Sequence, residues 1–124
     1  MTNFYADPDS VKALRDQAES VFCVSSMATW PDDYAPQLMD TVLHEAAHNL
    51  GPSHEYKVAG KTDDQVFGGP MASMLEEFKA QTGALFFTDW LVERSLLDKA
   101  AADKAHTRSI AWAFGHISRG MYTD

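Results

Sequence analysis

The chain has 124 residues, 45% of them hydrophobic, which suits one globular domain and excludes a disordered polypeptide. Its 18 acidic and 10 basic residues give a formal charge of −8, which argues against nucleic acid or an anionic membrane as partner. No signal peptide or membrane-spanning run is recognisable, and the lone Cys23 cannot form an internal disulfide. We therefore expect a cytoplasmic protein in which Cys23 is buried as a packing residue.

The first third of the chain predicts a helix, an extended passage and a turn. Asp7 followed by Pro8 is typical of a helix start, and "DSVKALRDQAESVF" continues with helical spacing. "VFCVSSMATW" is rich in β-branched and aromatic residues, so we expect at most a short extended segment near residues 21–29. "WPDDYAPQ" then predicts a turn.

Apolar residues recur at helical intervals from about residue 36 to 50, and Gly51-Pro52 ends that helix. We expect its apolar stripe to face the core and its histidines to face a groove. The stripe consists of Met39, Val42, Leu43, Ala46, Ala47 and Leu50.

A polar loop over residues 51–70 precedes a long helix expected over 70–91. The predicted core stripe of that helix is Met71, Met74, Leu75, Phe78 and Leu85. A last helix follows in "SLLDKAAADKAHTRSIAWAFGHISRG", with a break expected near Asp98. The predicted fold is therefore mainly α, a compact helical bundle formed as a single domain by residues 1–124.

The stretch "HEAAH" within the 36–50 helix has the form H-E-x-x-H. Histidines four residues apart on a helix present two imidazoles to one ion, so His44 and His48 are candidate zinc ligands. Glu45 lies beside them and is a candidate general base. The sequence therefore predicts a Zn²⁺ site on this helix.

Zinc in such a site needs a third protein ligand, and two candidates are available. His54 completes the longer pattern H-E-x-x-H-x-x-G-x-x-H of the metzincins. Those enzymes build a twisted sheet before the metal helix, and only 43 residues precede His44 in this chain. The alternative is a glutamate from "EEFKAQ" in the next helix, Glu76 or Glu77.

The segments "VLHEAAHNLGPS" and "MLEEFKAQTGALFF" together resemble the zinc-binding half of the dipeptidyl peptidase III family, especially its shorter bacterial members. The resemblance covers about residues 40–120 and contains two signatures in the right order. It implies His44 and His48 as ligands, Glu45 as general base and Glu77 as third ligand. It also implies that the Glu76 carboxylate contacts a metal ligand without binding the metal itself.

The chain departs from the family pattern in several places. Gln81 stands where the family has an acid that orients a ligand histidine, and an amide can accept the same hydrogen bond without adding charge. The family enzymes are several times longer and close a second lobe over the substrate. They also use a further histidine at the transition state, for which His106 is our candidate catalytic residue.

These observations predict a zinc-dependent, metallopeptidase-like hydrolase acting on a small molecule or short peptide. One alternative is an open zinc site that hydrolyses activated esters or phosphoesters, and another is a non-catalytic, metal-stabilised interaction module. We also expect a homodimer, because one small domain cannot readily bury every large apolar side chain of the last two helices. The side chains in question are Phe86, Phe87, Trp90, Trp112, Phe114, Ile117 and Met121.

Overall fold

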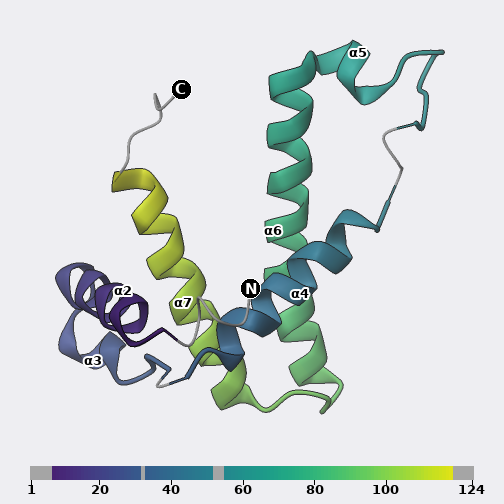
Figure 1. Ribbon diagram of the computed structural model, residues 1–124. Helices are drawn as coiled ribbons and strands as arrows, with labels where there is room; N and C mark the ends of the chain where they lie inside the picture. The colour runs from purple at the N-terminus through teal and green to yellow at the C-terminus, as the bar shows by residue number, and fades with distance from the viewer. Residues whose placement is uncertain (1–6, 32, 52–54, 119–124) are drawn as a thin grey trace.

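The computed structural model describes residues 7–31, 33–51 and 55–118, and within these ranges the chain is helical with no strand. The six helices of these ranges are α2 (Pro8–Val21), α3 (Val24–Met27), α4 (Ala35–His48), α5 (Asp63–Phe67), α6 (Gly69–Glu93) and α7 (Lys99–Ser118). Helix α4 lies across α6, α2 and α3 pack beside α7, and the α5 end of α6 projects away from the rest (Figure 1). The mainly α fold is confirmed. No helix in the described ranges is long and apolar enough to cross a membrane.

Helix α2 begins as the sequence predicts. The Asp7 carboxylate accepts a hydrogen bond of 2.8 Å from the Ser10 amide, and Pro8 occupies the first turn. Helix α7 begins directly after Asp98, whose carboxylate caps the Ala101 amide at 2.8 Å. The break expected near Asp98 is therefore the N-terminal cap of α7.

Within residues 21–29, Phe22 and Cys23 have extended backbone, whereas Val24–Met27 forms one helical turn, α3, and not part of a strand. The amides of Ser26 and Met27 donate to the Cys23 carbonyl, and the Cys23 thiol lies 3.1 Å from the Ser25 hydroxyl. Short polar side chains that bond locally favour a turn over a strand.

Cys23 is exposed, which corrects the expectation of a buried thiol. The hydroxyls of Ser25 and Ser26 lie beside its sulfur, and hydrogen bonds from them lower the pKa of the Cys23 thiol to about 7. A burial prediction from residue type alone failed at this position because the turn of α3 holds the side chain at the surface.

Helices α4 and α6 approach each other through small side chains. A methyl group added at Gly83 of α6 would lie 2.8 Å from the Cβ of Ala47 in α4, closer than two such carbons can come. The buried residues of α6 are Ala72, Ala80, Ala84 and Thr88. The two backbones therefore lie close together at the point where α4 carries its histidines.

The apolar stripes predicted to form the core are largely exposed. All five residues of the α6 stripe are exposed, and so are Val42 and Ala46 of α4 and Leu50, two residues after its end. The small-residue contact between α4 and α6 determines which faces meet, so the large side chains point outward and the histidine side of α4 faces α6. The second packing centre lies elsewhere, where Trp30 joins Ala18 of α2 and Ala111 of α7.

Candidate metal centre

His44 and His48 lie one turn apart near the C-terminal end of α4, on the side that faces α6. Their rings stack edge to face with centroids 4.8 Å apart. They are 18% and 25% exposed, whereas the Glu77 side chain from α6 is 63% exposed. The centre therefore lies at the surface along the line where the two helices meet, with the imidazoles on the sheltered side.

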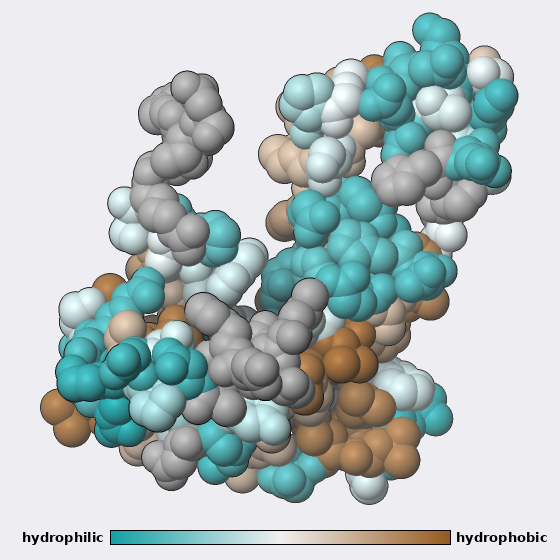
Figure 2. Space-filling view, in the orientation of Figure 1, coloured by the Kyte–Doolittle hydropathy of each residue, from teal (hydrophilic) through white to brown (hydrophobic). Residues whose placement is uncertain are grey.

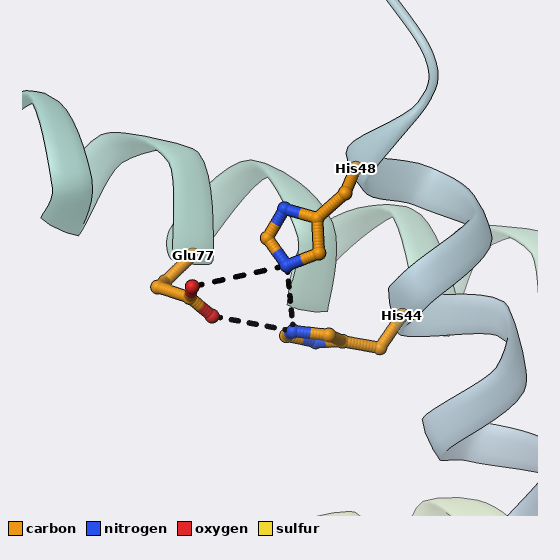
Figure 3. A group of neighbouring side chains, drawn as sticks. All are labelled: His44, His48 and Glu77. Carbon is orange, nitrogen blue, oxygen red and sulfur yellow. Dashed lines mark hydrogen bonds and ion pairs between the residues drawn. The ribbon is translucent and has the colours of Figure 1, made fainter.

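The three side chains direct their donor atoms to one point (Figure 3). The Nε2 atoms of the two histidines are 3.1 Å apart. Glu77 places one carboxylate oxygen 3.2 Å from Nε2 of His44 and the other 3.8 Å from Nε2 of His48. Tetrahedral zinc with bonds of about 2.0–2.1 Å separates its ligand atoms by about 3.3 Å, so this spacing fits one such ion.

The other nitrogen of each ring is held by an oxygen from α6. Nδ1 of His44 donates to the Gln81 amide oxygen at 3.1 Å, and Nδ1 of His48 donates to the Glu76 carboxylate at 3.0 Å. Because both acceptors are oxygens, each Nδ1 carries a proton, and Nε2 is the ring atom of each histidine that is directed at Glu77. Two ring nitrogens beside one carboxylate are an arrangement that a bound cation would stabilise.

Glu76 and Gln81 thus occupy the positions that the family resemblance implies for residues behind the ligands. The amide of Gln81 accepts the hydrogen bond from a ligand histidine, as expected of a residue that replaces an acid. His54 lies outside the described residues. Among the described residues, Glu77 is the acidic side chain that joins the two histidines as a third donor.

Glu45 follows His44 in α4 and is exposed. Both residues line a cavity of about 220 Å³ between α4 and α7. The far wall of the cavity comes from α7 and includes Arg108, Ser109 and Trp112. The candidate base therefore lines a small cavity with both polar and apolar walls, directly beside the candidate ligand His44.

The structure does not bring His106 to this centre. Its Nε2 lies 2.9 Å from the carboxylate of Asp89 in α6. Asp89 is twelve residues beyond Glu77, which is about 18 Å along the helix axis at 1.5 Å per residue. His106 therefore joins α6 to α7 away from the candidate ligands, and its catalytic role stays a prediction.

Arg108, two residues after His106, is the α7 cation that reaches the cavity. Its guanidinium lies 4.8 Å from the centroid of the Trp30 ring and donates to the side chain of Gln37. Sequence reasoning missed both Arg108 and Lys79, which contacts Glu76. Lys79 stands in the quoted "EEFKAQ" at a helical i, i+3 spacing that could have drawn attention to it.

The resemblance to the dipeptidyl peptidase III family rests on the two sequence signatures alone. Comparison of the chain with protein-family models, curated proteins and solved structures gave no match.

Proposed function

We propose that this chain is a zinc-dependent hydrolase of the metallopeptidase-like type, with His44, His48 and Glu77 as the metal ligands. The observation that carries the proposal is the convergence of three donor atoms within 4.8 Å, with both Nδ1 atoms engaged by acceptors behind them. Surface clusters of histidine and glutamate are common. A cluster in which Nδ1 of each histidine has an acceptor and both Nε2 atoms are directed at one point is the arrangement typical of a metal site.

When bound, zinc acts as a Lewis acid and lowers the pKa of a coordinated water so that this water can attack a carbonyl near neutral pH. In this proposal Glu45 takes the proton from the attacking water and returns it to the leaving group. Arg108 supplies a fixed positive charge on the opposite wall of the cavity, where negative charge that develops on the substrate is favoured.

The size of the cavity, about 220 Å³, favours a small molecule or the end of a short peptide as substrate. The single cysteine fits a reducing compartment, and a cytoplasmic location is part of the proposal. Hydrolysis of activated esters or phosphoesters by the same centre is the competing reaction. A metal-stabilised module without turnover is the competing class of function.

The test of the reaction is Glu45→Gln, which keeps the size of the side chain and removes the base. We expect zinc to remain bound while zinc-dependent hydrolysis falls on the order of a hundredfold or more. The measurement is turnover of short peptides, activated esters and phosphoesters by zinc-loaded protein, with and without a chelator, together with the zinc content of each sample.

Asp40→Asn is the matched control, because Asp40 lines the same cavity one turn before His44 and the substitution removes the same charge. An equal fall in both variants would assign the effect to the charge of the cavity and not to a base. Zinc-loaded wild-type protein that turns over none of the three substrate classes would leave the non-catalytic module as the function.

A further inference from the structure

Lys79 makes three polar contacts that connect the two helices of the metal centre. Its ammonium lies 2.7 Å from the Glu76 carboxylate, one turn earlier on α6. It also donates to the carbonyl of Leu50 at 3.0 Å and to that of His48 at 3.5 Å. Glu76 is the sheltered partner, with a side chain 18% exposed against 36% for Lys79.

The His48 carbonyl is the last of α4, where the final carbonyls of a helix have no partner within the helix, and the Leu50 carbonyl follows two residues later. A lysine ammonium there satisfies them and interacts favourably with the negative end of the helix dipole. Lys79 therefore ties the end of α4 to α6 through the same group that contacts Glu76.

Glu76 in turn accepts the hydrogen bond from Nδ1 of His48 at 3.0 Å. A continuous series of contacts thus runs from the Leu50 carbonyl through Lys79 and Glu76 to the His48 ring. Movement of the Lys79 ammonium would release the Glu76 carboxylate, which orients the His48 ring. It would also release the end of α4, the helix that carries His48.

We propose that Lys79 is a positioning residue of the metal centre, which holds Glu76 against His48 and clamps the end of α4 to α6. This inference rests on the proposed function only in taking His48 as a metal ligand. Lys79 acts through Glu76 and does not touch the metal or the substrate.

Positioning can be separated from a simple charge effect because the two have opposite signs. A positive charge near a divalent cation weakens metal binding, so its removal would tighten binding if charge were the whole role of Lys79. Loss of a positioning contact weakens binding, and partners behind a ligand typically contribute 10- to 100-fold to affinity. Because Lys79 acts through Glu76, we expect Lys79→Met to weaken binding about tenfold, the lower end of that range.

The experiment measures Zn²⁺ affinity by competition with a chromophoric chelator, and the visible absorption spectrum of the Co²⁺-loaded protein, for Lys79→Met and Lys79→Arg. Arginine can reach the same oxygens and keeps the charge, so it should restore most of the affinity and a spectrum close to wild type. Lys12→Met is the matched control, because it removes an exposed lysine that pairs with Asp16 on α2. We expect this control to bind both metals as wild type does.

Glu76→Gln provides a second route if Lys79→Met does not fold, as judged by circular dichroism of the metal-free protein. It keeps an acceptor for His48 and removes the ion pair with Lys79, so it should also weaken binding. Where both variants fold, their combination should lose little more than either alone, because both act on one series of contacts.

Metal affinity in Lys79→Met equal to or tighter than wild type would overturn the positioning role, as would additive losses in the double variant. Wild-type protein that binds no zinc would overturn the proposed function, and this inference with it. Failure of the inference alone is therefore recognised by wild-type protein that binds zinc and a Lys79 variant that binds it equally well.

Discussion

The two imidazoles of the candidate centre are held by different groups. His44 is oriented by the neutral amide of Gln81, whereas His48 is oriented by the carboxylate of Glu76. A charged acceptor forms a stronger hydrogen bond and makes the opposite ring nitrogen a better donor to a metal. We therefore expect His48 to be the stronger ligand of the two.

The identity of the third ligand separates two kinds of zinc site at the level of a single residue. Glu77→Ala removes a carboxylate that lies 3.2 Å from Nε2 of His44, so it should weaken zinc affinity strongly, by at least about tenfold. His54→Ala is the control and should bind zinc nearly as wild type does. Isothermal titration of both variants is the measurement, and the reverse pattern would indicate a metzincin-like site.

The pattern H-E-x-x-H alone predicts His44, Glu45 and His48, and its two histidines share a face because residues four apart on a helix do so whatever the helix packs against. Glu76 and Glu77 were candidates from the next helix, and the resemblance to known signatures implied their separate roles and drew attention to Gln81. His106 and Arg108 show the limit of this reasoning. Which of them reaches the cavity depends on the rotation of α7 against α6, and no local pattern encodes that rotation.

At the scale of the helix, α6 is apolar on two opposite faces. One face carries alanines, Gly83 and Thr88 and packs against α4, whereas the other carries methionine, leucine and phenylalanine and is exposed. Periodicity predicts that α6 has an apolar stripe. The stripe of large side chains was predicted to face the core, in preference to the stripe of small ones. The prediction of the helix was right and the prediction of its buried face was wrong, because close approach of two backbones requires small side chains.

This close contact yields a prediction for the fold and the metal centre together. Gly83→Ala places a methyl group 2.8 Å from the Cβ of Ala47, so α4 and α6 must separate. We expect the clash to lower the free energy of unfolding by roughly 1–3 kcal/mol. The better helix propensity of alanine offsets about 1 kcal/mol of that loss. Zinc affinity should fall too, because the ligands come from both helices. Denaturant unfolding and zinc titration are the measurements.

The compensating double variant Ala47→Gly with Gly83→Ala is the control for that experiment. It moves the methyl group from one helix to the other and restores the space between them. Zinc affinity in the double variant should return toward wild type, although glycine in α4 lowers its stability by about 1 kcal/mol. Zinc affinity unchanged in Gly83→Ala alone would show that the helix separation does not control the centre.

At the scale of the whole molecule, the chain exposes more surface than its size requires. Its accessible area is 8855 Å², whereas a compact monomer of 13.8 kDa is expected to expose about 6,600 Å². Apolar surface is conspicuous over the lower part of α6 and its turn toward α7 (Figure 2). Some of the aromatic residues expected at a dimer interface, among them Phe86, Trp112 and Phe114, are exposed, and Met121 lies outside the described residues.

The longest apolar surface is the outer face of α6, which faces away from α4. It comprises Met71, Met74, Leu75, Phe78, Leu85 and Phe86, each between 36% and 68% exposed. Six such side chains at roughly half exposure present on the order of 600 Å², since a large apolar side chain has roughly 200 Å². A stable two-chain interface needs about 600 Å² or more from each partner, so a second copy of α6 would suffice.

We therefore predict that the protein forms a two-fold dimer in which the outer faces of two α6 helices pack together. Phe78→Glu introduces a charge near the middle of that face and should convert the dimer to a monomer that still binds zinc, because Phe78 is 68% exposed and is not among the three candidate ligands. Val24→Glu is the control, since Val24 is 91% exposed on α3, away from α6, and this variant should remain dimeric. Sedimentation equilibrium at micromolar concentration is the measurement. Wild-type protein that sediments as a monomer, or Phe78→Glu protein that sediments as a dimer, would contradict this interface.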